Sequence, residues 1–274
     1  MTPVFEKSPV PRFFALIPCA GLGSRAVALS ADTAPGQRLP KQYQAIAGRA
    51  MVLHTLEAFA QVPRITRCLV VVAPDDDFFS TTSSTGCEVE ACGGSSRAAS
   101  VLAGLQRLVS SGATTDDWVL VHDAARCLIT AELIERLIDA CQHDAVGGLL
   151  AQPLPDTLKQ GLEGRVSATL QRSDKWLAQT PQMFRLGALN NALTMAHSRG
   201  DSVTDEASAM EAVGLAPQLV RGSAHNFKVT FPEDFLLAEA LITSRTPVRP
   251  RITAGRSEAA VIPVPDHSPS HEPL

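Results

Sequence analysis

Short apolar segments alternate with longer amphipathic segments in the first half of the chain, and this alternation limits the fold more than any other feature. The apolar segments predict buried strands at residues 13–18, 67–73, 87–91, 118–122 and 145–151. Between them, apolar residues recur at helical spacing, which predicts helices at residues 50–61, 97–110 and 130–143. Strict alternation of strands and helices is typical of a mostly parallel sheet that is covered on both faces. We therefore expect an α/β fold with a Rossmann-like sheet.

The alternation stops after residue 151. Prolines and a glycine border two polar, strand-like segments at residues 156–160 and 165–171. A hairpin with so few apolar residues cannot bury much of itself, so we expect it to project from the core or to pack on another subunit. The regular pattern then returns, with helices expected at residues 186–197, 205–213 and 232–242 and strands at residues 218–221 and 226–230.

The two ends of the chain differ in composition from the part between them. Residues 1–12 include Glu6 and Lys7 and contain no apolar stretch of the kind found in a secretion signal. Residues 244–274 are rich in proline and carry one short apolar stretch, too little to form part of a core. We expect an N-terminal extension, one domain over residues 13–243 with an arm at about 152–173, and a disordered tail. No second domain is expected after Ile242.

The charge balance and the cysteines exclude several classes of protein. The chain has 24 Lys and Arg against 28 Asp and Glu, a net charge of −4, and so lacks the basic surface that nucleic-acid binding needs. No apolar run approaches the roughly 20 residues that cross a membrane. The six cysteines form no Cys-x-x-Cys pair and mostly lie in or beside apolar runs, as reduced cysteines do. We expect a cytoplasmic protein with neither a nucleic-acid nor a membrane partner, and without a structural metal.

The strongest local signal is a glycine-rich loop directly after the first predicted strand. Gly21 and Gly23 allow backbone N–H groups to approach an anion, at the sheet edge where α/β folds bind ligands. Arg25 and Lys41 follow, and two cations around such a loop suit a triphosphate. The loop also fits a dinucleotide fingerprint, but that needs a helix at once and an acidic residue about 20 positions later. The sequence predicts neither, and it lacks the Walker pattern.

Eight motifs follow one another along the chain, at residues 18–25, 40–43, 93–101, 122–126, 156–159, 180–182, 204–208 and 228–234. In this order and spacing they resemble the 2-C-methyl-D-erythritol 4-phosphate cytidylyltransferase family of the non-mevalonate isoprenoid pathway, over about residues 13–243. The sequence departs from the family at Cys127, where proline is usual, and at Ser95, where an acidic residue is frequent. The fifteen residues between Arg25 and Lys41 also exceed the usual number.

The resemblance implies a nucleotidyltransferase that joins the cytidylyl group of CTP to 2-C-methyl-D-erythritol 4-phosphate, giving 4-diphosphocytidyl-2-C-methyl-D-erythritol and pyrophosphate. Two anions must meet in this reaction, so the protein mainly supplies cations and positioning. The implied catalytic residues are Arg25, Lys41, Arg172 and Lys228. The implied nucleotide-binding residues are Pro18, Cys19, Ala20, Gly21, Gly23, Gly94, Ser95, Ser100 and Ala124. The implied acceptor-binding residues are Asp123, Arg126, Thr157 and Thr180.

The resemblance further implies Mg²⁺ or another divalent cation at Asp123, and a homodimer in which the hairpin serves as dimerisation arm and carries Thr157 and Arg172 across to the partner. Simpler functions remain open for single residues. Asp123 and Ser100 could each cap a helix, and Arg126 could orient loops instead of the acceptor. Thr204 and Asp205 are first of all expected to cap a helix, and His122 is expected in the core.

Three other functions remain open from the residues alone. A related cytidylyltransferase would use another polyol phosphate, such as ribitol 5-phosphate. A dinucleotide-binding oxidoreductase would bind NAD(P) and tolerate the loss of Lys41. A nucleotide-binding regulator without catalysis is disfavoured because the charged residues of the reaction, Arg25, Lys41, Asp123 and Lys228, are all present.

Overall fold

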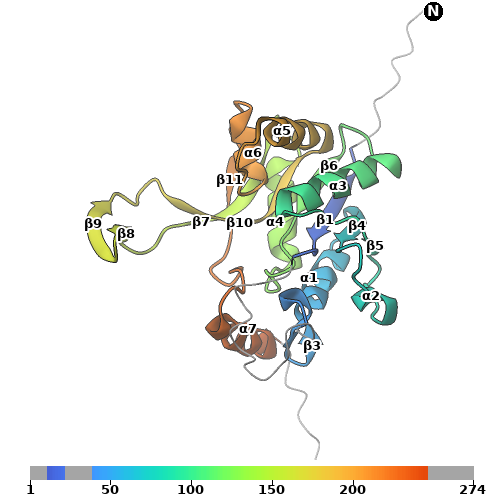
Figure 1. The fold of residues 1–274 in the computed structure, drawn as a ribbon, viewed down its shortest axis with the longest axis horizontal. Helices are drawn as coiled ribbons and strands as arrows, with labels where there is room; N and C mark the ends of the chain where they lie inside the picture. Colours follow the sequence, from blue (N-terminus) through green and yellow to red (C-terminus); the bar gives the residue numbers. More distant parts are fainter. Residues whose placement is uncertain (1–10, 22–38, 246–274) are drawn as a thin grey trace, which may run out of the picture.

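A seven-stranded sheet forms the centre of the computed structural model, which describes residues 11–21 and 39–245 (Figure 1). The strand order is β11–β7–β10–β6–β1–β4–β5. The strands are β1 (Phe13–Pro18), β4 (Ile65–Val71), β5 (Glu88–Glu90), β6 (Trp118–Val121), β7 (Gly147–Pro153), β10 (Trp176–Arg185) and β11 (Gln218–Arg221). Only β10 runs antiparallel to its neighbours. The prediction of a mostly parallel α/β sheet is confirmed.

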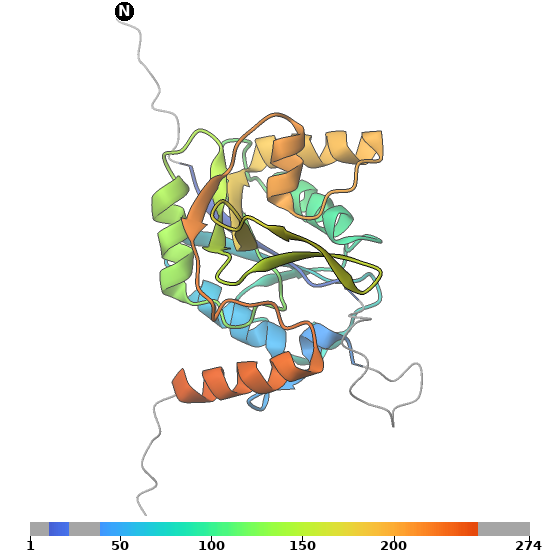
Figure 2. The same ribbon diagram turned by 90° about the vertical axis from the view of Figure 1, so that its left-hand side faces the viewer.

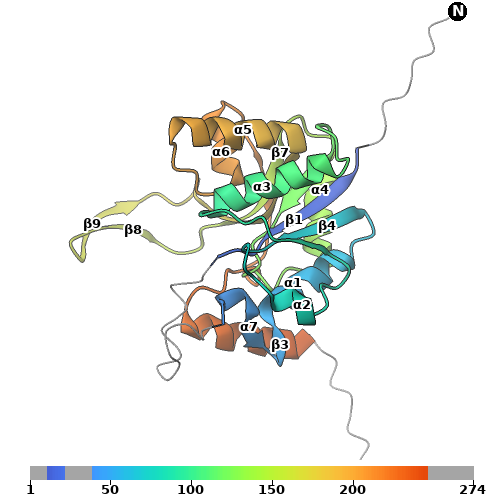
Figure 3. The ribbon, with the colours of Figure 1, turned by 45° about the vertical axis from the view of Figure 1, so that its right-hand side comes forward.

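Helices cover both faces of this sheet because its central strands are apolar on both sides. In β1, Ala15 and Ile17 join one buried cluster while Phe14 and Leu16 join another, as alternate residues of a strand must. The first cluster includes side chains of α1 (Met51–Ala60) and α4 (Ala131–Cys141). The second includes side chains of α3 (Arg97–Ser110), α5 (Leu186–Arg199) and α6 (Glu206–Ala212). Figure 3 shows α3 and α5 on one side of the sheet and α1 on the other.

A third, smaller apolar cluster attaches the last helix, α7 (Pro232–Arg245), beside α1. It includes Ile46, Met51 and Leu128. Four short elements in the region of α1 were not predicted: the 3-10 helix η2 (Lys41–Tyr43), β2 (Ala45–Ile46), β3 (Arg49–Ala50) and α2 (Phe78–Thr81). No helix among the described residues has both the length and the apolar character needed to span a bilayer.

The polar segments after β7 form the predicted projecting hairpin, which we call the arm. Its strands are β8 (Leu158–Leu162) and β9 (Arg165–Leu170), paired only with each other. Figure 1 shows the arm extending away from the sheet, and in Figure 2 the arm points toward the viewer, in front of the sheet. It continues a longer ribbon, because β7 and β10 pair up to Pro153 and Trp176 and the Leu154 amide then bonds to the Lys175 carbonyl at 3.0 Å.

Two sequence predictions about strands were wrong or incomplete. The segment 226–230 is a loop, in which the Val229 amide donates to the Ala125 carbonyl and the Asn226 side-chain amide donates to the Thr180 carbonyl. Strand β10 was missed, since Pro181 argues against a central strand. The structure accommodates this proline at a register shift between Ala178 and Gln182. Residues 1–10, 22–38 and 246–274, which include most of the N-terminal extension and most of the expected tail, lie outside the described residues.

Candidate active site

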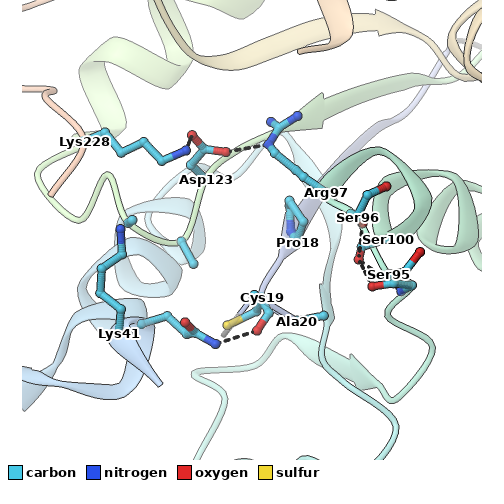
Figure 4. Close-up of a pocket in the computed structure, with 15 residues that line it drawn as sticks. Pro18, Cys19, Ala20, Lys41, Ser95, Ser96, Arg97, Ser100, Asp123 and Lys228 are labelled. Carbon is cyan, nitrogen blue, oxygen red and sulfur yellow. Dashed lines mark hydrogen bonds and ion pairs between the residues drawn. The ribbon is translucent and has the colours of Figure 1, made fainter. Parts of the chain in front are cut away.

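A pocket of about 580 Å³ opens at the carboxyl ends of β1 and β6 (Figure 4). This is the edge at which open α/β sheets bind their ligands. The lining residues are Pro18, Cys19, Ala20, Gly21, Lys41, Gln42, Gly94, Ser95, Ser96, Arg97, Ser100, Asp123, Ala124, Ala125 and Lys228. Most of the residues expected to bind the nucleotide therefore lie on one cavity.

One wall of the pocket is backbone from the end of β1 and the start of α3. A side chain at Gly93 would lie 2.3 Å from the Ala20 Cβ atom and 2.7 Å from the Val72 carbonyl oxygen, so only glycine lets these segments approach each other. The Ser100 hydroxyl accepts the Gly94 amide at 3.1 Å and donates to the Ser96 carbonyl at 2.9 Å. Helix α3 is capped by Ser96, not by Ser100. The Ser100 hydroxyl therefore fixes the loop that carries Gly94.

The opposite wall of the pocket carries Lys41 and Lys228. The Lys41 ammonium donates to the Val229 carbonyl at 2.7 Å. Beside it, the buried Gln42 amide donates to the Cys19 carbonyl at 2.8 Å and ties η2 to the end of β1. Figure 4 shows Lys41 and Lys228 on the same side of the pocket, opposite the Ser95 to Ser100 segment.

Asp123 lies at the centre of a cluster of cations. Its Oδ1 atom accepts from Arg97 Nε at 2.8 Å, its Oδ2 atom accepts from Lys228 Nζ at 2.9 Å, and Arg126 Nε lies 3.8 Å from Oδ2. Burial alone would raise the pKa of Asp123, but Arg97 and Lys228 lower it by more, so the pKa lies well below the usual range of a carboxyl. Asp123 is therefore ionised, and it is not a helix cap.

His122 lies behind Asp123 and is fully buried, as expected. Its Nε2 atom contacts the Arg126 carbonyl at 3.3 Å, and its Nδ1 atom lies 3.0 Å from the Thr180 hydroxyl. A carbonyl can only accept, so Nε2 carries the proton, and Nδ1 accepts from Thr180. The Thr180 oxygen in turn accepts the Asp123 amide at 3.0 Å. This series of hydrogen bonds holds the backbone of Asp123 in place.

Burial lowers the pKa of His122 from 6.5 to about 3, which makes the folded state sensitive to acid. Between these two values the unfolded chain binds a proton that the folded chain does not, so stability falls as the pH falls from 6.5 toward 3. We expect a slope that approaches about 1.4 kcal/mol per pH unit within this window. Urea unfolding at pH 7, 6 and 5 measures it. The variant His122→Gln should show a flatter dependence, and an unchanged slope would contradict this explanation.

A second cavity of about 180 Å³ shares Arg97, Asp123 and Lys228 with the larger pocket. Its other lining residues are Arg126, Ala178, Gln179, Thr180, Gln182, Thr204 and Asp205. The Arg126 guanidinium donates to the Asn226 carbonyl at 2.8 Å and to the Ala178 carbonyl at 3.2 Å, so it orients neighbouring loops. The ionic cluster around Asp123 thus belongs to both cavities.

Two residues predicted for the site are not brought to these cavities. Thr157 and Arg172 lie exposed at the arm, where the Arg172 guanidinium donates to the Pro155 carbonyl. Gly23 and Arg25 lie outside the described residues.

Sequence reasoning gave no site role to Arg97 and Glu206, although both belong to the motifs that were recognised. Arg97 lines both cavities and forms a forked ion pair with Glu206. A lone arginine at the start of a helix gives no sign in sequence of a carboxylate partner 109 positions away. Asp205 caps α6 through a capping box with Ser208, as expected, and also lines the second cavity.

The larger pocket suits a metal ion that is held partly by the protein and partly by a bound phosphate. Among the described residues, no group of three or more His, Cys, Asp or Glu side chains could hold an ion by itself. Of the described residues that line the larger pocket, Asp123 alone carries a carboxylate. Mg²⁺ is commonly held by one or two carboxylates together with substrate phosphates. The pocket therefore fits a divalent cation that arrives with a phosphorylated ligand.

Comparison with known proteins agrees with this geometry. The sequence profile of the family described as IspD, 2-C-methyl-D-erythritol 4-phosphate cytidylyltransferase, matches residues 13–244. A protein of that name from Paraburkholderia phymatum is 52% identical over 236 residues, which cover 84% of this chain and 96% of that protein. A bifunctional enzyme IspD/IspF from Albidiferax ferrireducens is 63% identical over 243 residues, 88% of this chain. The chain spans 55% of the length of that relative.

Solved structures give the same result. A crystal structure of 4-diphosphocytidyl-2C-methyl-D-erythritol synthase superposes with a TM-score of 0.73 at 36% identity, covering 85% of this chain and 99% of that one. The 2-C-methyl-D-erythritol 4-phosphate cytidylyltransferase of Francisella tularensis superposes with a TM-score of 0.69 at 32% identity, covering 84% and 99%. With a profile match across the whole sheet and its pocket, the chain belongs to the 2-C-methyl-D-erythritol 4-phosphate cytidylyltransferase family.

Proposed function

We propose that this protein transfers the cytidylyl group of CTP to 2-C-methyl-D-erythritol 4-phosphate and releases pyrophosphate, in the formation of isoprenoid precursors. The observation that carries the proposal is the ionic cluster of Arg97, Asp123 and Lys228, which lines both a large and a small cavity. The larger cavity has the volume of a small-molecule site and suits the nucleotide. The smaller one suits the polar acceptor.

In this reaction a phosphate oxygen of the acceptor attacks the α-phosphorus of CTP. The new P–O bond forms as the bond between the α-phosphorus and the bridging oxygen breaks, and the electron pair leaves with pyrophosphate. Negative charge gathers on the α-phosphate oxygens, so fixed cations lower the barrier. Lys228, which reaches both cavities, is proposed to neutralise the meeting phosphates, and Lys41 the triphosphate.

A divalent cation, Mg²⁺ or a substitute, is proposed to enter with the triphosphate, and when bound it would neutralise the leaving pyrophosphate. Asp123 is the residue proposed to hold it. In the structure both Asp123 oxygens bind protein cations, Arg97 at one and Lys228 at the other. Lys228 has the flexible side chain of the two, so it is the partner that can give way.

The homodimer is part of the proposal. The arm leaves apolar side chains uncovered, with Leu162 67% and Val166 65% exposed, and neither belongs to an apolar cluster of the core. A second copy of the chain can cover them and would bring Thr157 and Arg172 to its partner's second cavity. We also propose a cytoplasmic location, in line with six cysteines that are all unpaired.

The test is an assay with CTP, a divalent cation and a panel of polyol phosphates that includes 2-C-methyl-D-erythritol 4-phosphate and ribitol 5-phosphate. Pyrophosphate release should be fastest with the branched acceptor, and the product should carry a cytidine diphosphate group by mass spectrometry. Preference for ribitol 5-phosphate would change the acceptor but keep the reaction. No pyrophosphate with any acceptor would refute the proposal.

Removal of metal should stop the reaction without unfolding the protein. A chelator should abolish pyrophosphate release, because it removes the cation proposed to enter with the triphosphate. The melting temperature should stay nearly unchanged, because the described residues contain no group of side chains that could hold a metal ion without substrate. Addition of excess Mg²⁺ should restore full activity. Activity that survives chelation, or irreversible unfolding on chelation, would contradict the expected metal role.

A further inference from the structure

Glu206 is a buried carboxylate to which the proposed reaction assigns no role. It is the first residue of α6, and its side chain is 1% exposed. Its two oxygens accept from the two terminal nitrogens of Arg97, at 2.6 and 3.0 Å. The third nitrogen of Arg97, Nε, donates to Asp123 Oδ1 at 2.8 Å. Arg97 therefore links the buried Glu206 to the carboxylate that lines both cavities.

The two oxygens of Asp123 are held in different ways. A guanidinium is a rigid planar fork, and three hydrogen bonds to two carboxylates leave Arg97 one orientation. Oδ2 is instead bound at 2.9 Å by the ammonium of Lys228, whose flexible side chain is 37% exposed, while Arg126 Nε lies farther away at 3.8 Å. Oδ1 is thus fixed, while Oδ2 can exchange its partner.

Glu206 is itself fixed relative to the sheet. Helix α6 begins with Asp205, whose side chain accepts the Ser208 amide at 3.0 Å. Gln182 of β10 clamps the same helix end, since its oxygen accepts the Ala207 amide at 2.7 Å and its nitrogen donates to Asp205 at 2.9 Å. A carboxylate in the first turn is also favoured by the helix dipole. The contacts that lead from Gln182 in β10 through Glu206 and Arg97 to Asp123 therefore leave these side chains little freedom to move.

We propose that Glu206 is a positioning residue of the active site. Through Arg97 it holds the Asp123 carboxylate in one orientation, so that Oδ2 alone is left to exchange Lys228 for a divalent cation. The inference rests on the proposed function, because it concerns how the same carboxylate is presented. Loss of Glu206 would leave the two terminal nitrogens of Arg97 without their carboxylate partner. The Arg97 side chain could then move together with Asp123 or bind the substrate phosphates, and it would no longer fix the orientation of the Asp123 carboxylate.

The variant Glu206→Gln tests this, because it keeps the size of the side chain and removes its charge. The probe is Mn²⁺, whose free-ion electron paramagnetic resonance signal is titrated with protein at a fixed CTP concentration, after the binding of Mn²⁺ to CTP alone has been measured without protein. We expect binding about 10-fold weaker or more, the scale seen when a group that orients a metal ligand is lost, and a similar fall in kcat. The variant Glu206→Asp keeps the charge and should recover part of both losses.

Asp117 offers a matched control at the opposite end of β6. It is also a buried carboxylate, 4% exposed, and it too binds an arginine through two nitrogens, Arg12 Nε at 3.3 Å and a terminal nitrogen at 2.7 Å. Asp117→Asn should therefore lower the melting temperature much as Glu206→Gln does. Its Mn²⁺ affinity and its kcat per folded molecule should match those of the unaltered protein.

The outcomes separate the two proposals. If Glu206→Gln behaves like Asp117→Asn, losing stability alone, Glu206 is only structural and the inference is wrong. If the unaltered protein binds no Mn²⁺ with CTP, Asp123 presents no metal position and the inference is wrong as well. Failure of the proposed function would instead appear as absent pyrophosphate release in the unaltered protein, whatever the variants do.

Discussion

Replacement of Lys228 by alanine should lower kcat by about 10²-fold or more, the scale for losing one preorganised charge contact to a transition state. Lys228 lines both cavities, so its ammonium lies where the two phosphorylated substrates would meet. The fold should survive, because Asp123 keeps its bond to Arg97. Pyrophosphate release at saturating CTP and acceptor measures the effect.

Arg64→Ala is the control for this variant. It removes a cation that binds Glu135 and Asp139 at the protein surface, away from both cavities. This variant should retain nearly full activity. Activity close to normal in Lys228→Ala would rule out a role for this lysine in the transfer step and would weaken the assignment of the whole ionic cluster.

Two inactive variants should restore activity when they are mixed, if the arm completes the partner's site. Lys41→Ala removes a cation from the large pocket, and Arg172→Ala removes one from the arm. We expect each homodimer to be nearly inactive. After subunit exchange, about half of the dimers are hybrids, and each hybrid carries both defects in one site and none in the other. Two-fold symmetry therefore predicts about a quarter of normal activity.

Mass spectrometry of the intact dimers provides the check that hybrids have formed. If they form and the mixture stays inactive, each site is built from a single chain and the arm has another purpose. If Arg172→Ala alone is fully active, the arm's arginine does not touch the acceptor, and only the dimerisation part of the proposal survives.

The sequence predicted well those elements that follow from local pattern. Alternating apolar runs identified the strands that flank β1, and the polarity of residues 156–171 identified the projecting hairpin. The resemblance to the cytidylyltransferase motifs implied most of the residues that line the large pocket, and many of these lie just after strands that end at one sheet edge.

The parts that could not be predicted depend on contacts between distant segments. Strand β10 contains Pro181, which as a local signal favours a loop, and pairing with β6 and β7 overrides it. The fork between Arg97 and Glu206 joins residues that share no local pattern. The segment 226–230 was predicted as a strand, but its Val229 amide bonds to the Ala125 carbonyl rather than to a sheet neighbour.

The continuous ribbon of β7 and β10 has a consequence for how this architecture can vary. The arm begins where Leu154 and Lys175 already face each other across a ladder hydrogen bond, so a tight turn could join them and leave the core hairpin whole. Lengthening a loop adds only a slowly growing entropic cost. If the arm joins the proposed dimer, insertions or deletions at this junction would alter the dimer contact and leave the central sheet and its pocket intact.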